Sequence, residues 1–546
     1  MHLIKSYFLS SKYIVLLFWF GLIPLTGCSD EKNQTSTNSS SSTPKSSTAS
    51  SSITQSSSSI AGATDSPYTG EWRAPAYGYI LSVSNQADTV TVKTYSVTED
   101  YCLLQDVASN LPLDKFKKSY TYSNNGKESL LQSKGHYPPG VEYERVDHLP
   151  EVCRENLQNL KKDGSYRFDA KRDFDIFWQT FNELYINFEL REMDWSNVYT
   201  DSLNAIEKIK NEDELFAFLS TVITPLGDGH AALLKAPLSQ NIDESIAKAI
   251  ENNDGIFFGV STQINVHQKM VNEYIRLLEA EGALSGELTA EQISAADEYY
   301  LTNYLQMMNI IFSYATEDSE VKVRAAGEIA WFKTTDNIGY LIIGSMAGYD
   351  GKSTLASDVG IDLVIAEAAF DEALEDFVDT EGIIIDVRIN EGGQDQVALN
   401  FVRHFIDKPQ FVYSKFSGHG NSRTAQKNVV LEPHVDNIYL KPTAVLVSGD
   451  TASAAELFTI AMASLPQVTI IGEPTAGEFS DILVKRLTSD ILFGISNETY
   501  LDTQGNNYER IGIPVDVNVP FATLQERKGA YDGGIETAIE WIKATP

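Results

Sequence analysis

From residue 338 onward, short apolar runs alternate with longer amphipathic stretches. The runs have the length and composition of buried strands, whereas the stretches between them repeat their apolar residues at helical spacing. This alternation predicts an α/β fold with a mostly parallel sheet and crossover helices. Strands are expected at 338–344, 383–388, 443–448 and 468–472, with helices at 358–378, 395–406 and 535–544.

One strand and the helix after it meet at a serine. VLVSGDTASAAELF (445–458) predicts a strand, a tight turn and a helix, with Ser453 in the first turn of that helix. Unpaired N–H groups and the positive end of the helix dipole stabilise developing negative charge at such a position. A nucleophilic hydroxyl fits there. The alternative is that Ser453 and Thr451 simply cap the helix.

Two glycine-containing turns add candidate residues. INEGGQD (389–395) follows a predicted strand, and Gly392 and Gly393 allow backbone N–H groups to approach a ligand closely. A plain turn would also explain these glycines. The second turn, LGDGH, follows a predicted helix over 211–223 and ends at His230. A lone histidine is usually structural, but a glycine-rich turn would expose this one for proton transfer.

Composition restricts the class of protein. The 546 residues carry a formal charge of −33, with 42% hydrophobic residues. The chain can therefore bury the cores of two or three domains. The acidic balance argues against a nucleic-acid partner, because phosphate binding needs clustered lysine and arginine.

The N-terminus reads as a targeting segment. Lys5 and Lys12 precede or border an apolar run at 13–25 that is short for a membrane span, and LTGC then ends at Cys28. This pattern resembles the lipobox of bacterial lipoproteins, which implies lipidation of Cys28 and, with Ser29 next, an outer-membrane location facing the periplasm or the cell surface. An ordinary secreted protein and a plain N-terminal membrane anchor are the alternatives.

The remaining two cysteines, Cys102 and Cys153, form an even pair in an exported chain. Such a pair suggests a disulfide, although two free buried cysteines are also possible. Around them, residues 77–83 and 89–95 alternate apolar and polar residues on either side of SNQAD, which predicts a hairpin. Further along, an aromatic stripe over 174–188 predicts a core-facing helix.

Four motifs in this order together resemble the S41 serine peptidases, the family of the C-terminal processing (tail-specific) proteases and the tricorn-like proteases. The resemblance implies a ClpP/crotonase-like catalytic core. It rests on segments spread over roughly 168–235 and 325–546: TPLGDGHA (224–231), IGYLIIGSMAGY (338–349) with IIIDVRINEGG (383–393), TASAAE (451–456) with VTIIGEPTAG (468–477), and YERIGIPVDV (508–517).

The resemblance also implies roles for particular residues. The processing proteases place a lysine base where this chain has Glu478, and Lys485 falls too late. The tricorn-like branch instead uses a histidine in a motif like LGDGH, which implies His230 as the base.

The same branch carries a glutamate after the serine, which implies Glu509, with Asp502 as a rival. Its second serine is Gly229 here, so that tetrad is incomplete. The family's oxyanion hole implies Gly392 or Gly393 together with the N–H of Ala454.

The sequence therefore predicts a lipid-anchored cell-envelope serine peptidase acting on protein or peptide substrates, with no metal or organic cofactor. The alternatives are a non-catalytic binding protein and an envelope scaffold built on the same domain. The expected organisation is a signal peptide (1–28), a Ser/Thr-rich tether (29–66), a small β-rich domain (67–160), a helical part of the peptidase region (168–235), an insertion or degenerate PDZ-like region (236–330) and the catalytic domain (331–546).

Overall fold

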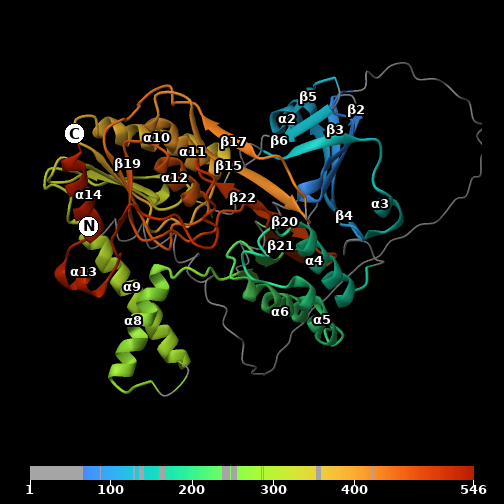
Figure 1. Ribbon diagram of the computed structural model, residues 1–546, viewed down its shortest axis with the longest axis horizontal. Coiled ribbons are helices and arrows are strands. Elements are labelled where there is room, and N and C mark those ends of the chain that lie inside the picture. Colours follow the sequence, from blue (N-terminus) through green and yellow to red (C-terminus); the bar gives the residue numbers. More distant parts are fainter. Residues whose placement is uncertain are drawn as a thin grey trace, which may run out of the picture.

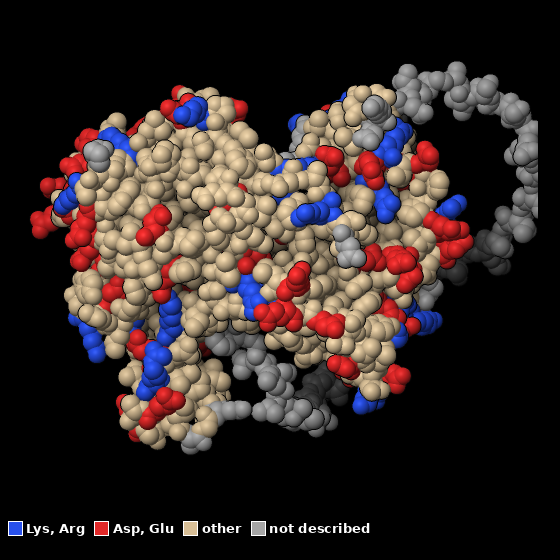
Figure 2. Space-filling view, viewed as in Figure 1, with Lys and Arg blue, Asp and Glu red and all other residues tan. Residues whose placement is uncertain are grey.

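The computed structural model describes residues 66–86, 88–126, 129–133, 140–158, 166–236, 246, 255–284, 286, 288–351, 358–420 and 422–545. The expected lipobox at Cys28 and almost all of the expected tether lie outside these residues. The N-terminal sheet and the C-terminal α/β region lie at opposite ends of the long axis in Figure 1. Acidic side chains are spread over both ends in Figure 2, in keeping with the net charge of −33. None of the described helices is long and apolar enough to cross a membrane.

The N-terminal region is an eight-stranded sheet in the order β5-β6-β7-β1-β2-β3-β4-β8. The predicted hairpin is present, but its strands run further than expected, because Gln86 pairs with Thr89 and most of SNQAD is strand. The elements are β1 (Gly70–Ala74), η1 (Pro75–Tyr77), β2 (Tyr79–Gln86), β3 (Thr89–Val97), β4 (Cys102–Pro112), α2 (Leu113–Ser119), β5 (Tyr120–Asn124), β6 (Ser129–Ser133), β7 (Glu142–Val146), α3 (Glu151–Glu155) and β8 (Leu157–Gln158).

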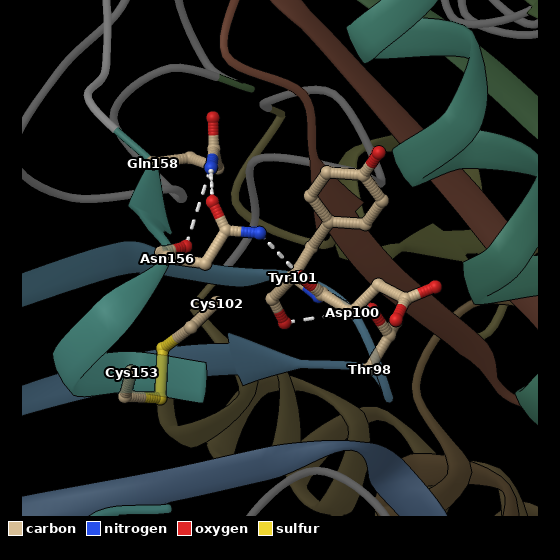
Figure 3. Close-up of a disulfide and its surroundings, with 7 residues drawn as sticks. All are labelled: Thr98, Asp100, Tyr101, Cys102, Cys153, Asn156 and Gln158. Carbon is tan, nitrogen blue, oxygen red and sulfur yellow. Dashed lines mark hydrogen bonds between the residues drawn. A yellow bond between two sulfur atoms is a disulfide. The ribbon is translucent and has the colours of Figure 1, made fainter. Parts of the chain in front are cut away.

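A disulfide fastens α3 to the start of β4 (Figure 3). It joins Cys102 to Cys153, the two cysteines that the sequence paired. The bridge closes a loop across a sequence separation of 51 residues. Constraining the unfolded chain in this way contributes about 4 kcal/mol to stability by the chain-entropy relation.

The middle of the chain packs three helices on a four-stranded sheet. The aromatic stripe lies inward as predicted, with Phe174, Phe177 and Phe181 fully buried. The helix predicted at 211–223 is α6, capped by the Asn211 side chain. The elements are α4 (Ala170–Leu184), α5 (Trp195–Ile206), α6 (Glu212–Ile223), η2 (Thr224–Leu226), β9 (Ala232–Lys235), β10 (Ile256–Phe258), β20 (Ile482–Arg486) and β21 (Ile491–Ser496), and the sheet order is β10-β9-β21-β20.

Two long helices follow in the region where an insertion or a degenerate PDZ-like fold was expected. They are α8 (Val266–Ala280) and α9 (Ala290–Phe312). Both begin with a capping box, at Asn265 and Thr289. They project as a hairpin from the C-terminal region in Figure 1, so this part of the region is helical.

The C-terminal region contains a seven-stranded sheet in the order β11-β12-β13-β14-β18-β19-β23. Strands β13 to β23 are parallel along this order, which confirms the predicted α/β class. Both faces of the sheet are covered: Ile383 and Ile385 of β14 pack with α10, α11 and α12, whereas Ile384 packs with α9 and α14. The strands are β11 (Lys322–Arg324), β12 (Ile329–Lys333), β13 (Gly339–Ile343), β14 (Ile383–Asp386), β18 (Thr443–Val447), β19 (Val468–Gly472) and β23 (Val517–Asn518).

The helices of this region follow the predicted positions closely. The helix expected at 358–378 is α10, and that at 395–406 ends earlier because a 3-10 turn takes over at Arg403. The helical elements are η3 (Ala325–Gly327), α10 (Val359–Asp376), α11 (Asp395–Val402), η5 (Arg403–Phe405), α12 (Ala454–Ala463), α13 (Leu524–Gly529) and α14 (Gly533–Ala544). A smaller sheet of β15 (Gln410–His419), β16 (Ser422–Arg423), β17 (Lys427–Leu431) and β22 (Glu498–Leu501) completes the fold.

Candidate functional site

Ser453 lies between β18 and α12 in a strained conformation. The sequence placed it in the first helical turn, but it is the N-cap residue, one position before Ala454. Its φ is 54° and its ψ is −124°, a region that residues other than glycine rarely adopt. Such strain costs on the order of 1–3 kcal/mol and persists only where neighbouring contacts enforce it. The Ser453 N–H donates to the Glu478 carbonyl at 3.2 Å and to Glu456 Oε2 at 3.3 Å.

The turn before Ser453 is tied to the loop after β14. Thr451 donates its hydroxyl to the Val387 carbonyl at 2.8 Å, and the Ala452 N–H donates to the Asn390 carbonyl at 3.1 Å. Thr451 therefore braces two strand ends and does not cap α12. These bonds hold the carboxyl ends of β14 and β18 together beneath Ser453.

The glycine turn of that loop faces Ser453 directly. A Cβ atom on Gly392 would lie 2.7 Å from Ser453 Cβ and 3.0 Å from the Ala454 nitrogen, so only glycine fits. The Gly392 N–H is already donated to Asn390 Oδ1 at 2.9 Å. Among the described residues, the N–H groups of Gly393 and Ala454 make no hydrogen bond. Of the two glycines that the sequence proposed, Gly393 therefore has the N–H that remains available.

Glu456 lies fully buried in the first turn of α12 and holds the loop after β19. Its carboxylate accepts hydrogen bonds from Thr475 Oγ1 at 2.6 Å, the Gly477 N–H at 2.8 Å and the Glu478 N–H at 2.7 Å. Burial raises the pKa of Glu456 to about 7, against the opposing effect of these donors. Glu456 thus fixes Ser453 and the 475–478 loop in one arrangement.

His230 is 8% exposed and follows a buried aspartate. Asp228 accepts hydrogen bonds from the His230 N–H at 2.9 Å and from the Tyr185 hydroxyl at 2.8 Å. The ring atom Nδ1 of His230 is buried with no hydrogen-bond partner among the described residues. Burial lowers the pKa of His230, and the nearby Asp228 carboxylate only partly opposes this effect. The ring is therefore neutral at pH 7.

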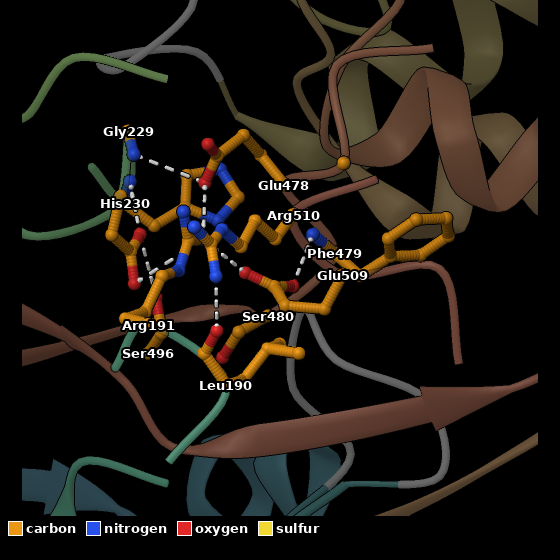
Figure 4. Close-up of polar contacts among 12 residues, drawn as sticks. Leu190, Arg191, Gly229, His230, Glu478, Phe479, Ser480, Ser496, Glu509 and Arg510 are labelled. Carbon is orange, nitrogen blue, oxygen red and sulfur yellow. Dashed lines mark hydrogen bonds and ion pairs between the residues drawn. The ribbon is translucent and has the colours of Figure 1, made fainter. Parts of the chain in front are cut away.

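Arg191 lies at the centre of three buried carboxylates (Figure 4). Its Nη2 is 2.7 Å from Glu509 Oε1, 3.5 Å from Glu478 Oε2 and 3.8 Å from Asp228 Oδ2. One guanidinium cannot neutralise three carboxylates. Burial and Asp228 accordingly raise the pKa of Glu509 to about 8, and burial with both neighbouring carboxylates raises the pKa of Glu478 well above its usual value.

Glu478 joins the histidine side of the site to the serine side. Its backbone carbonyl accepts the Ser453 N–H, and its Oε2 accepts the Gly229 N–H at 3.0 Å. A Cβ atom on Gly229 would lie 3.4 Å from Glu478 Cδ. The Glu478 side chain therefore packs against the LGDGH turn.

The structure thus brings the predicted residues together in two groups. Ser453, Gly392, Gly393 and Ala454 form one group, and His230 and Glu509 belong to the other, around Arg191. No hydrogen bond joins Ser453 Oγ to His230 within the described part of the chain. Glu509 does not contact the histidine through a described hydrogen bond; it binds Arg191 and accepts the Phe479 N–H at 3.0 Å.

The rival residues lie elsewhere. The ammonium group of Lys485 donates to the Tyr77 carbonyl at 2.6 Å, in the contact with the N-terminal sheet. Asp502 accepts hydrogen bonds within its own loop, from Asn506 and from the Tyr508 hydroxyl.

Three important residues were not found from the sequence. Glu456 carried a usable signal, because S-x-x-E at 453–456 is the spacing of a capping box. Asp228 lay inside the quoted LGDGH motif, where only the histidine was singled out. Arg191 carried no local signal, since its carboxylate partners are 37 to 318 residues away in the chain.

Comparisons with known proteins show which family part of the chain resembles. The model of peptidase family S41 matches residues 337–519, which contain the serine, the glycine turn and Glu509. The chain is 27% identical over 152 residues to a carboxy-terminal-processing protease of Bartonella bacilliformis, covering 28% of this chain and 34% of that protein. It is 28% identical over 137 residues to the carboxy-terminal processing protease CtpA of Bacillus subtilis, covering 25% and 28%.

A solved structure from Parabacteroides merdae has a TM-score of 0.49 and 21% identity, covering 69% of this chain and 97% of that one. The sequence matches span only about a third of each curated relative's length. Residues 337–519 are a peptidase family S41 domain, as the sequence predicted.

The carboxylate cluster generates a prediction about stability and pH. The raised pKa of Glu478 means that the folded state keeps a proton that the unfolded state loses above about pH 4.5. Its contribution to stability is therefore present at low pH and is lost as the pH rises. Glu478→Gln keeps the neutral form and should gain at least about 1 kcal/mol over wild type between pH 5 and pH 8. Urea unfolding at both pH values measures this difference.

Asp502→Asn is the matched control. Its hydrogen bonds hold the pKa of Asp502 below its usual value, so this carboxylate contributes stability at neutral pH that is lost on acidification. As the pH rises, the free energy of unfolding relative to wild type should increase for Glu478→Gln and decrease for Asp502→Asn. A Glu478→Gln protein that loses stability relative to wild type at pH 8 would contradict the charge excess in the cluster.

Proposed function

We propose that this protein is a serine peptidase in which Ser453 is the nucleophile. The observation that carries the proposal is the strained serine at the start of α12, which lies against Gly392, while the N–H groups of Gly393 and Ala454 make no hydrogen bond among the described residues. A tetrahedral intermediate places an oxyanion beside its nucleophile, and two N–H donors at that point stabilise it. The positive end of the α12 dipole adds to the same effect.

In this mechanism the neutral His230 ring accepts the Ser453 proton as the hydroxyl attacks the scissile carbonyl. The ring then donates the proton to the departing amine, and water repeats the sequence on the acyl-enzyme. In this mechanism Ser453 Oγ and the His230 ring come within hydrogen-bonding distance when the substrate binds, since catalytic hydrogen bonds often tighten only in the complex. Glu509 acts as a positioning residue, because it binds Arg191 and accepts a hydrogen bond from the backbone N–H of Phe479.

This assignment keeps the histidine-based, tricorn-like chemistry, with a ClpP/crotonase-like core around Ser453. The sequence relatives are named carboxy-terminal processing proteases. Because of this similarity, we propose protein or peptide substrates for this chain. Glu478 occupies the position of a lysine base, but its carboxyl group faces Gly229 and Arg191.

The alternative is a non-catalytic binding protein. One observation favours it: Ser453 Oγ and His230 share no hydrogen bond among the described residues. In that case the same two N–H groups would bind a peptide carboxylate without turnover.

Kinetics on a fluorogenic casein separate the two functions. Ser453→Ala and His230→Ala should each lower kcat by roughly 10³-fold or more, and the double variant should lose little more, because the two side chains act as a unit. Activity should still be retained at about pH 6.5, the ordinary histidine pKa, and should fall only at lower pH, because burial lowers the pKa of His230.

Lys485→Met is the control, because Lys485 lies outside the site and methionine fills a similar buried volume. It should leave kcat within a few-fold of wild type. Turnover that survives in both Ser453→Ala and His230→Ala, or is absent from a folded wild-type protein, would contradict the peptidase mechanism.

We further propose that Cys28 is lipidated and holds the protein on the outer membrane of a bacterial envelope. The LTGC pattern supports this anchor. Acyl chains supply the affinity of such a protein for lipid. Cys28→Ala should therefore release the protein from the membrane fraction or leave its precursor uncleaved, as fractionation and intact mass measure. Membrane retention of a normally processed Cys28→Ala protein would contradict the anchor.

A further inference from the structure

A second buried cluster of charged side chains surrounds Lys415 on β15. The ammonium nitrogen is 3.0 Å from Glu498 Oε2 and 3.1 Å from Asp481 Oδ2. The Tyr500 oxygen lies 3.1 Å from the same nitrogen, and its hydroxyl group donates to one of these two carboxylates. Lys415 is 5% exposed and Glu498 is 2% exposed, so water screens these contacts little.

A third carboxyl group, that of Asp395, completes this Lys415 cluster. Asp395 is the first residue of α11, two positions after Gly393, and it is buried. Its side chain hydrogen bonds to Asp481, which requires a proton on one of the two carboxyl groups. Burial raises the pKa of both groups. The cluster therefore reaches the glycine turn that faces Ser453.

The Lys415 cluster also holds the segment 478–481, whose first residue accepts the Ser453 N–H through its carbonyl. The Asp481 carboxylate is a member of the cluster, and the Ser480 hydroxyl accepts the Glu498 N–H at 3.1 Å. At its other end the segment belongs to the Arg191 cluster, through the Glu478 side chain. Buried charges therefore anchor this short segment at both ends.

The N-terminal sheet contributes one side chain to the Lys415 cluster. Tyr77, the last residue of η1, donates its hydroxyl to Glu498 Oε1 at 2.5 Å and accepts the Ser417 hydroxyl at 2.8 Å. Strands β15 and β22, which carry Ser417 and Glu498, lie between the two ends of the molecule in Figure 1. The other members of the cluster all come from the C-terminal region, so Tyr77 links the two regions at a charged site.

We propose that Tyr77 is a positioning residue of the peptidase, which holds segment 478–481 in place for Ser453 through Glu498 and Lys415. The inference rests on the proposed function, because it concerns the same serine. Without the Tyr77 hydroxyl, Glu498 Oε1 would keep only the Ser417 hydroxyl, at 3.4 Å. A buried carboxylate that loses a donor attracts the nearest cation more strongly. The shared ammonium group would then shift towards Glu498 and release Asp481.

A second tyrosine separates positioning from simple docking of the two regions. Tyr79, the first residue of β2, donates its hydroxyl to the Val484 carbonyl at 2.6 Å, outside the Lys415 cluster. Tyr77→Phe and Tyr79→Phe each remove one hydrogen bond that the N-terminal sheet donates to the C-terminal region. Only Tyr77→Phe removes a donor from the cluster, so Tyr79→Phe is the matched control.

Hydrogen exchange of the full-length chain, read by mass spectrometry, tests the structural part of the proposal without any need for activity. Tyr77→Phe should speed amide exchange in peptides covering 478–482 by about threefold or more, whereas Tyr79→Phe should not. Exchange in β14 should stay at the wild-type rate in both variants, which excludes a general loss of the fold. Wild-type exchange at 478–482 in Tyr77→Phe, or equal acceleration there in both variants, would overturn the proposal.

Kinetics on the fluorogenic casein test the functional part. Tyr77→Phe should lower kcat roughly tenfold and leave KM within about twofold, because the displaced segment positions the serine and does not bind substrate. Tyr79→Phe should keep both constants near their wild-type values. The same loss of kcat in both variants, or a change in KM alone, would overturn the positioning role. A wild-type protein without turnover would contradict the proposed function instead, and hydrogen exchange would still decide whether Tyr77 holds the segment.

Discussion

The hydrogen bond from the Ser453 N–H to the Glu478 carbonyl, 3.2 Å long, holds the site together. It joins the start of α12 to the segment after β19, and the Glu478 side chain continues the link to the Gly229 peptide. Without it, the positive φ of Ser453 would lose one of the contacts that enforce it. Ser453 and the His230 turn are thus coupled through one residue, Glu478.

This coupling has an electrostatic cost that the fold tolerates. Asp228, Glu478 and Glu509 share a single guanidinium, and at least one of them keeps its proton at neutral pH because burial disfavours uncompensated charge. Functional sites commonly retain strain and charge that a purely structural core would remove. Here a strained serine and a cluster of three carboxylates with one guanidinium are joined by one hydrogen-bond network. This combination indicates a functional site.

Much of the fold followed from local patterns. The parallel strands, α6 and the aromatic core of α4 all follow from hydrophobic periodicity, which acts over a few residues. The positions of Ser453 and His230 came from motifs of similar length. What the sequence did not provide was set by distant contacts, because Arg191 meets Glu509 across 318 residues. The choice between Gly392 and Gly393 likewise needed the Asn390 side chain in place.

Covalent labelling with a fluorophosphonate probe, followed by peptide mapping, tests the central claim most directly. Such a probe reacts only with a serine whose hydroxyl is activated and whose oxyanion is stabilised. We expect a single adduct on the peptide that contains Ser453, formed more slowly in His230→Ala and absent from Ser453→Ala. A folded protein that takes up no label, or that is labelled on a different serine, would contradict the account of Ser453 as the activated nucleophile.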